Sequence, residues 1–343
     1  MNCDLQRLND IFTAVQTTLI ERSQFSLEEF NHEFDELKHF EGRQLCDDDY
    51  YEILVKVIFY SGFRAATVDK YMPSIMRRFP DYKTVMGYGK EAFNEIANAD
   101  DMIKNTRKIN ACIDNAERFD KIVKEHGSFE SYINLFAPGE NDGNLFRFKK
   151  ALEKFDFIGP VTAYHFMKDI GLNVIKPDIV LMRIFKRLGF IKNPNNLWGA
   201  VKIGRQFREA TNLPIQYIDF VFVLYGQLNI PKFECICSEK KPNCGLCGVS
   251  EFCRYFWYHN DTGIRTGRAL NCGSGDFVAC YSQSELEETR AALSAILTEC
   301  EMNRNGKEPG ISQQTLPDGR VRALRLALQL IESEMNTYEP HDI

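Results

Sequence analysis

The chain has 343 residues, of which 44% are hydrophobic and 26% are charged. These values are typical of a soluble globular protein with one large domain or two of ordinary size, and they exclude wholesale disorder. The sequence has no run of eighteen apolar residues and no basic segment followed by an apolar leader, so neither a membrane span nor a secretory signal is expected.

Charge is unevenly distributed along the chain, although the net charge of −6 by itself argues weakly against a nucleic-acid partner. Residues 1–50 carry 12 acidic and 4 basic side chains, whereas residues 140–230 carry 8 acidic and 13 basic ones. Phosphate binding requires a locally positive surface, so the second of these segments is the expected place for a nucleic-acid contact.

The N-terminal half is expected to be helical. Residues 1–40 predict one or two acidic helices, and the Asp-rich run at 46–52 is typical of a solvated helix start, where acidic groups suit the helix dipole. From residue 51 to 136 the apolar pattern is helical, and no alternating strand pattern occurs. Breaks are expected at Gly62, Pro80–Asp81, Gly87–Gly89 and Gly127.

Residues 149–190 predict a helix, a tight hairpin, a second helix, and a loop whose Asp opens a third helix. Gly159 and Pro160 mark the hairpin, because Gly tolerates the turn and Pro at a first helical position gives up an N–H that has no partner there. One face of the second helix is apolar, and the opposite face carries Val161, Tyr164, His165 and Lys168. We expect that opposite face to contact something other than the core.

Helices are also predicted at 199–210 and 214–228, the latter strongly apolar. After an irregular, Gly-rich stretch at 254–283, two amphipathic helices are expected at 284–303 and 318–336. No repeat of fixed period occurs, so a solenoid is not indicated.

Four cysteines form the pattern Cys237-x6-Cys244-x2-Cys247-x5-Cys253 within the eleven cysteines of the chain. Such a cluster favours a metal site in a reducing compartment over a disulfide framework. Four thiolates suit zinc or an iron–sulfur cluster, and the presence of only one C-x2-C pair favours iron–sulfur. Cys235 lies two residues before the first of the four and is treated as an adjacent thiol.

The segment CSEKKPNCGLCGVSEFCRYF (237–256) resembles the cluster loop of the endonuclease III family of helix-hairpin-helix DNA glycosylases. The resemblance implies a [4Fe–4S] cluster that shapes a DNA-binding loop rather than performing chemistry. It also implies that Lys240 and Lys241 contact DNA phosphate.

The segment FDFIGPVTA (155–163) resembles the hairpin of the same glycosylases, with Phe157 in place of the usual first glycine. The resemblance implies a monovalent cation at the turn carbonyls and a DNA phosphate at the start of the following helix, formed here by Gly159, Pro160, Val161 and Thr162. Free N–H groups and the positive end of the helix dipole are what such a phosphate contact requires.

Asp178 lies seventeen residues after Val161, where these enzymes carry their catalytic Asp. An Asp before an apolar periodic run is also a common N-cap, and one residue can serve both purposes. A carboxylate suits the reaction, because cleavage of an N-glycosidic bond builds positive charge on the sugar. Arg183, Lys186 and Arg187 form a basic stripe on the following helix, which either binds phosphate or is a solvated face.

Val161 occupies the position where bifunctional members of the family place a nucleophilic Lys. The nearest replacement amine, Lys168, lies seven residues further, roughly 10 Å along the helix. The resemblance therefore predicts a monofunctional glycosylase that leaves an abasic site.

The segment 103–133 resembles the 3-methyladenine DNA glycosylase I family, but Val57 and Ala65 stand where that family has a pocket Glu and Trp, and its zinc ligands have no counterpart. Arg64, in the loop SGFRAAT, is the expected wedge that fills the gap left by a flipped base, within one residue of register. Tyr164 and His165 are candidates for contact with that base or for ordinary surface residues. Phe59, Tyr60 and Phe63 are expected in the core.

The sequence thus predicts an all-α, two-domain helix-hairpin-helix glycosylase fold. The expected parts are N-terminal helices at 1–49, a barrel at 50–172, a cluster domain at 173–256 and a helical extension at 257–343. The predicted function is removal of a damaged, mispaired or modified base from double-stranded DNA, in the bacterial cytoplasm or a eukaryotic nucleus. A non-catalytic lesion sensor, a bifunctional lyase and a zinc-bearing interaction protein are the alternatives.

Overall fold

The computed structural model describes residues 3–38 and 44–259, together with residues 290, 294, 327 and 328. The described residues form helices and loops, and their single β-bridge joins Ser23 to Phe233, so the predicted all-α class is confirmed. No helix in the described part of the chain is long and apolar enough to cross a membrane.

The chain divides into two compact units, Met1–Ile264 and Arg265–Ile343. The helices predicted at 284–303 and 318–336 belong to the second unit and lie outside the described residues, apart from the four isolated positions.

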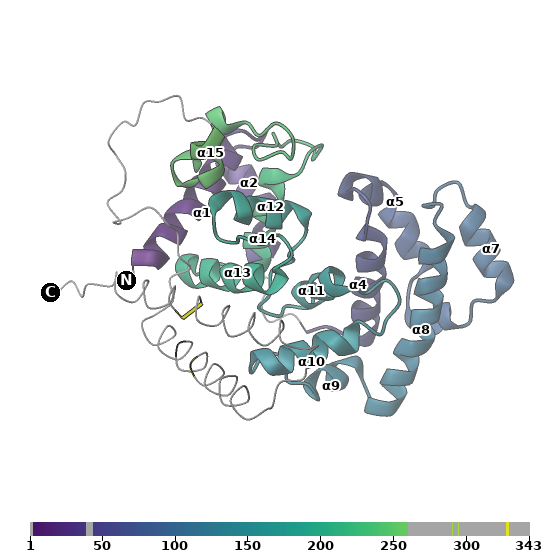
Figure 1. The fold of residues 1–343 in the computed structure, drawn as a ribbon. Helices are drawn as coiled ribbons and strands as arrows, with labels where there is room; N and C mark the ends of the chain where they lie inside the picture. Colours follow the sequence, from purple (N-terminus) through teal and green to yellow (C-terminus); the bar gives the residue numbers. More distant parts are fainter. Residues whose placement is uncertain (1–2, 39–43, 260–289, 291–293, 295–326, 329–343) are drawn as a thin grey trace, which may run out of the picture. The chain divides into compact units, whose positions relative to one another are not determined.

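One group of helices in the first unit follows the chain from α4 to α11 (Figure 1). These helices are α4 (Asp47–Tyr60), α5 (Ala65–Arg78), α6 (Tyr82–Met86), α7 (Lys90–Asn98), α8 (Thr106–His126), α9 (Phe129–Asn134), α10 (Asp142–Leu152) and α11 (Pro160–Asp169). The long helix α8 contacts α4, α6, α7 and α9 and is the centre of this group. Each predicted break falls between two of these helices, so those predictions are confirmed.

Local sequence explains where several of these helices begin. A short polar side chain at an N-cap accepts a hydrogen bond from a backbone N–H that would otherwise be unpaired. Asp81, Asn105, Ser128 and Asn141 accept in this way from the N–H groups of Thr84, Lys108, Ser131 and Asn144. Gly127 ends α8 with a φ of +85°, a conformation that glycine adopts without strain.

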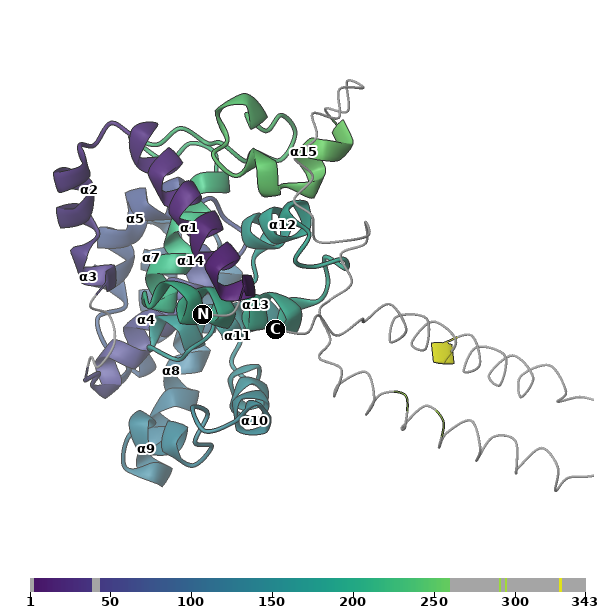
Figure 2. The same cartoon turned by 90° about the vertical axis from the view of Figure 1, so that its left-hand side faces the viewer.

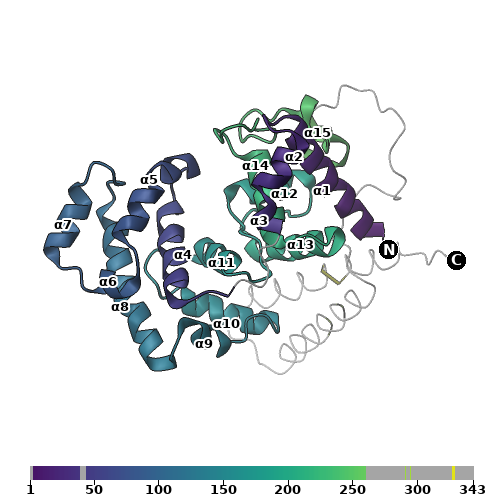
Figure 3. The ribbon, with the colours of Figure 1, turned by 180° about the vertical axis from the view of Figure 1, so that it is seen from behind.

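A second group combines N-terminal and later helices that are far apart in sequence but packed together (Figure 2). Its members are α1 (Cys3–Glu21), α2 (Leu27–Glu33), α3 (Asp35–Lys38), α12 (Ile179–Leu188), α13 (Leu197–Thr211), α14 (Ile215–Gly226), the short 3-10 turns η1 (Cys244–Leu246) and η2 (Ser250–Phe252), and α15 (Arg254–His259). Helix α1 packs against α13 and α14, and α3 contacts α14 (Figure 3).

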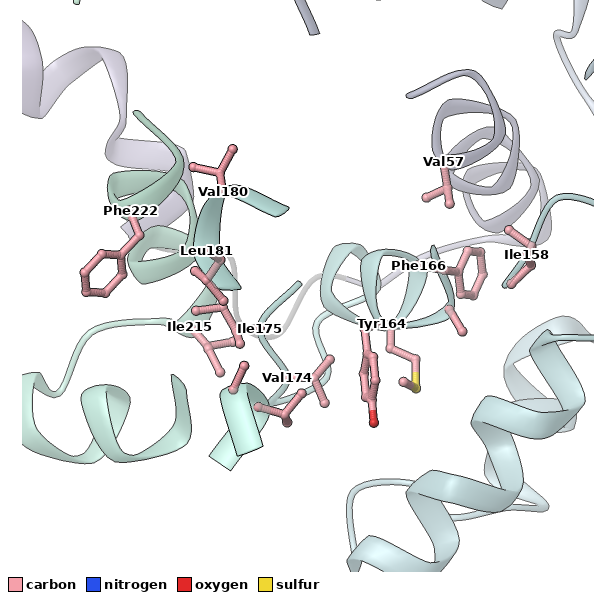
Figure 4. Packing of buried hydrophobic residues seen from close by; sticks show 14 of the residues in the cluster. Val57, Ile158, Tyr164, Phe166, Val174, Ile175, Val180, Leu181, Ile215 and Phe222 are labelled. Atoms are coloured by element: carbon pink, nitrogen blue, oxygen red, sulfur yellow. The ribbon is translucent and has the colours of Figure 1, made fainter. Parts of the chain in front are cut away.

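A continuous apolar core runs from α11 to α12 and fixes the segment between them. Phe166 on α11 points toward Ile158 (Figure 4), while Ile175, just before α12, lies near Leu181 and Ile215. All five side chains are at most 4% exposed. The hairpin and the start of α12 are therefore held by packed helices on both sides.

Candidate active site

Asp178 is the N-cap of α12. One carboxylate oxygen, Oδ1, accepts hydrogen bonds from the backbone N–H groups of Val180 at 2.9 Å and Leu181 at 3.0 Å. The other oxygen, Oδ2, lies 3.8 Å from Nζ of Lys176, and the Asp178 side chain is 19% exposed. One oxygen thus caps the helix while the other faces a cationic neighbour.

A cavity of about 620 Å³ borders Asp178. One wall comes from the loop between α4 and α5 and from Val161, Thr162 and His165 of α11. Other lining residues come from the start of α12, from Gly226 at the end of α14 and from the three residues that follow it. The structure therefore brings Asp178, Arg64 and the hairpin helix together around one cavity.

Buried charged groups lie beneath this cavity. Asp219 of α14 accepts a hydrogen bond from the backbone N–H of Lys176 at 2.8 Å, and so anchors the segment that leads into Asp178. Burial raises the pKa of Asp219 to about 6, against the opposing charge of Lys168.

Lys168 is the cation that compensates these buried carboxylates. Its Nζ lies 2.7 Å from Oδ1 of Asp169 and 3.8 Å from Oδ2 of Asp219. Burial lowers the pKa of Lys168, but the charges of the two carboxylates outweigh it and raise the pKa overall. The amine therefore stays protonated and paired, which is unsuitable for a nucleophile.

His165 lines the cavity but is only 9% exposed, with Nε2 3.2 Å from Oδ2 of Asp169. Burial lowers the pKa of His165 despite the neighbouring carboxylate, so a neutral imidazole is favoured at pH 7.

Tyr164 is 2% exposed, and Nζ of Lys149 lies 5.2 Å from the centre of its ring. Tyr164 is therefore buried, and it is not among the residues that line the Asp178 cavity. Helix α11 contacts α4, α10 and α14, and on the face opposite its apolar stripe Tyr164 and His165 are buried while Val161 borders the cavity.

The hairpin turn is closed by Thr162. Its Oγ1 accepts a hydrogen bond from the N–H of Gly159 at 2.6 Å and lies 3.1 Å from the carbonyl oxygen of Phe157. Phe157 has a φ of +65°, a left-handed conformation that strains a non-glycine residue, and its side chain is 38% exposed. Pro160 begins α11, as predicted from its fixed φ.

The loop between α4 and α5 places both Phe63 and Arg64 at the cavity. Arg64 is exposed and is the N-cap of α5. Phe63 is 38% exposed, so its expected place in the core is wrong, whereas Phe59 is fully buried. Tyr60 is half-buried at the cavity wall and donates a hydrogen bond to Asp69.

The basic stripe on α12 divides into residues with different surroundings. Arg187 donates hydrogen bonds to the carbonyl oxygens of Ser238 at 2.6 Å and Glu239 at 2.8 Å, and its guanidinium lies 4.6 Å from the ring centre of Tyr255. The Arg187 guanidinium therefore binds the cysteine loop.

Arg183 and Lys186 line the cavities of this face. Arg183 donates to the carbonyl oxygen of Gly226 at 2.6 Å and borders both the Asp178 cavity and an adjacent one of about 910 Å³. Lys186 is exposed in the adjacent cavity, together with Lys192. These two lysines make this surface positive.

The four cysteines lie close together in the loop that carries η1 and η2. Burial raises the pKa values of Cys244, Cys247 and Cys253, and Cys237 raises each of them further because like charges repel. Among the described residues, however, no three His, Cys, Asp or Glu side chains converge closely enough to form a ready metal site.

Two sulfur atoms of this loop already receive hydrogen bonds. Tyr225 Oη donates to Cys247 Sγ at 3.2 Å, and Arg187 Nη1 donates to Cys237 Sγ at 3.2 Å. Soft thiolates with hydrogen bonds to sulfur fit the donor set that iron–sulfur clusters use. Lys240 and Lys241 are exposed on the same loop.

Sequence patterns did not single out Lys176, Asp219 or Leu228 as members of this site. The order Lys-Pro-Asp at 176–178 was the available signal for Lys176, because a long side chain two residues before a helix-opening Asp can reach its carboxylate. Asp219 lies in a strongly apolar helix, where a lone carboxylate signals a buried partner.

Comparison with known families gives a match over residues 41–176. These residues include α4 to α11 and the hairpin, and the match ends two residues before Asp178. This part of the chain is similar to the methyladenine glycosylase family, and the match supports a DNA glycosylase enzyme that acts on DNA.

Proposed function

We propose that the protein is a monofunctional DNA glycosylase that flips a damaged, mispaired or modified base into the Asp178 cavity and hydrolyses its N-glycosidic bond. The observation that carries the proposal is the position of Asp178, which borders a cavity next to the hairpin helix of a methyladenine glycosylase-like barrel.

In this proposal Asp178 stabilises the positive charge that develops on the sugar as the base leaves. The two backbone N–H groups that donate to Oδ1 hold the carboxylate in a fixed orientation. The positive charge of Lys176, whose Nζ lies 3.8 Å from Oδ2, attracts this oxygen and helps to hold it in place.

DNA binding is assigned to groups around the cavity. At the start of α11, within the segment from Gly159 to Thr162, the N–H groups of Val161 and Thr162 and the positive dipole end are available to a phosphate. Phe63 or Arg64 fills the gap in the base stack, a task for which apolar wedges are common. Lys186, Lys240 and Lys241 supply further phosphate contacts.

The amines near the cavity support a hydrolytic rather than a lyase reaction. Val161 lines the cavity without an amine, and Lys168 is held protonated between two carboxylates. Lys176 also lines the cavity, but its Nζ faces the Asp178 carboxylate at 3.8 Å. A turn-bound monovalent cation and a [4Fe–4S] cluster at Cys237, Cys244, Cys247 and Cys253 complete the endonuclease III-like assignment. When bound, the cluster would shape the loop rather than take part in hydrolysis.

Mass spectrometry of bases released from a mixed panel of alkylated, deaminated, mispaired and hypermodified duplexes tests this function. We expect one class of free base, with alkali-labile abasic sites left in the DNA. Failure to release any base while lesion DNA is bound would favour the non-catalytic sensor, and efficient borohydride trapping of a covalent complex would contradict monofunctional hydrolysis.

A further inference from the structure

Lys108 is a cation buried inside the first group of helices, only 2% exposed, and no step of the proposed reaction uses it. Its ammonium group donates to the carbonyl oxygens of Ile58 and Ser61 and to that of Phe59 at 3.2 Å. These carbonyls belong to the last turn and C-cap of α4, where backbone acceptors lack helical partners and a positive charge is favoured.

The same ammonium group lies between two partly exposed aromatic rings. Its Nζ is 5.0 Å from the ring centre of Phe63 and 5.4 Å from that of Phe157, distances at which cation–π attraction operates. Phe63 belongs to the loop after α4 that borders the Asp178 cavity, and Phe157 belongs to the hairpin turn. One buried charge therefore touches both segments assigned to DNA.

Asn115 lies seven residues after Lys108 on α8 and thus on the same face of the helix. Its side chain forms two hydrogen bonds with the backbone of Asp156 in the hairpin, one from Nδ2 to the carbonyl oxygen at 3.0 Å and one from the N–H to Oδ1 at 2.8 Å. A second buried polar group of α8 thus fixes the hairpin turn independently of Lys108.

We propose that Lys108 is a positioning residue that, with Asn115, sets the loop 61–64 and the hairpin turn 156–159 at the spacing needed to hold a flipped nucleotide. Lys108 acts through Phe63 and Phe157 and does not touch the reacting atoms. The assignment of these segments to DNA rests on the proposed function, whereas their attachment to α8 does not.

Because Lys108 attracts the two rings through its positive charge, the proposal predicts that DNA binding depends on pH. Burial lowers its pKa to about 8, and the other titratable group that acts on it among the described residues is Cys112, which burial keeps as a neutral thiol. Phe63, Phe157 and the α4 carbonyls face it as uncharged groups. Above pH 8 the Lys108 ammonium group loses its proton, and its cation–π attraction to both rings weakens.

Deprotonation of Lys108 affects DNA binding and the free energy of unfolding in opposite directions. Because the pKa of Lys108 is lower in the folded chain than in the unfolded one, the folded state binds fewer protons between pH 8 and the ordinary lysine pKa near 10.5. This group therefore makes folding more favourable as pH rises through that window, so loss of the Lys108 charge does not itself destabilise the fold.

The test compares Lys108→Met with Lys104→Met. Lys104 is a matched control, because its Nζ also donates to helix-terminal carbonyls, those of Asn98 at 2.8 Å and Ala99 at 2.6 Å after α7, without touching either loop. Hydrogen exchange without DNA and fluorescence anisotropy with a duplex carrying a tetrahydrofuran abasic analogue are measured from pH 6.5 to 9.5.

We expect Lys108→Met to speed exchange in peptides covering 61–64 and 156–159 and to weaken binding by on the order of tenfold to hundredfold, because small misplacements of binding groups are costly. Wild type and Lys104→Met should lose affinity above about pH 8, whereas Lys108→Met should not. Unchanged exchange in both loops for Lys108→Met would overturn the proposal. If the wild-type protein binds DNA but releases no base, the glycosylase function is refuted, and the comparison of the two variants remains a valid test of Lys108. If the wild-type protein binds no DNA, the hydrogen-exchange result alone tests the role of Lys108.

Discussion

At the residue scale, the site depends on how buried charges are compensated. Lys168 neutralises Asp219, which is 4% exposed and itself anchors the backbone of Lys176. An ion pair of this kind adds little net stability compared with apolar residues, but removal of one partner leaves the other charge buried alone. Lys168 is thus a structural cation beneath the cavity rather than a spare nucleophile.

Replacement of Lys168 by Met should therefore lower the free energy of unfolding by about 3–5 kcal/mol, because Asp169 and Asp219 lose their shared counter-ion. Urea denaturation at pH 7 measures the change. The loss should shrink toward pH 5, where Asp219, with a pKa raised to about 6, becomes neutral and needs no partner.

Lys150 offers a matched control, since it pairs with Glu153 on the surface and its side chain is 78% exposed. Lys150→Met should cost less than about 1 kcal/mol. Equal losses for the two variants would contradict the structural role of Lys168.

At the element scale, the position of α12 depends on its close packing with α14. Gly226 ends α14, and a Cβ added there would lie 2.7 Å from Cγ1 of Val180 and 2.8 Å from Cδ1 of Ile184. The contact requires a residue without a side chain, so α12 and its N-cap Asp178 are placed by a glycine on a neighbouring helix.

Gly226→Ala should therefore push α12 outward, at a cost of about 1–3 kcal/mol in unfolding free energy. Base release should slow by up to about 100-fold, because Asp178 moves with the helix. Gly139→Ala is the control, since nothing lies within 4 Å of its added Cβ. If single-turnover base release by Gly226→Ala matches that of the control, packing at Gly226 does not set the catalytic geometry.

Local signals were sufficient to predict most of these elements. Helix breaks follow from Gly, Pro and Asp, whose backbone preferences act within a few residues, and the structure places a break at each predicted point. Tyr164 is buried although it lies opposite the apolar stripe, because helical periodicity separates two faces but does not show which neighbouring helices cover them. Lys176 and Asp219 were missed because their contact joins residues 43 apart in sequence.

At the scale of the whole first unit, the cysteine loop joins the N-terminal helix α1 to α12. The N–H of Gly248 donates to Thr18 Oγ1 on α1 at 3.1 Å, and Arg187 of α12 donates to Ser238 and Glu239. A cluster bound by this loop would therefore support α12 through Arg187 without entering the Asp178 cavity.

Protein purified without oxygen should be brown, with broad absorption near about 400 nm, as expected of a thiolate-bound iron–sulfur cluster. Cys247→Ser should bleach it and weaken DNA binding, whereas Cys112→Ser, which changes a fully buried thiol of α8, should keep the colour. A colourless wild-type protein that contains zinc would refute the iron–sulfur assignment.

The most direct test of the central claim is single-turnover base release by Asp178→Asn, measured beside its unfolding free energy. Asn caps a helix about as well as Asp, so stability should change by less than about 1 kcal/mol. Base release should nevertheless fall by at least about 100-fold, because the amide lacks the charge that stabilises the sugar cation. Unchanged release would show that Asp178 only caps α12 and would contradict the proposed active site.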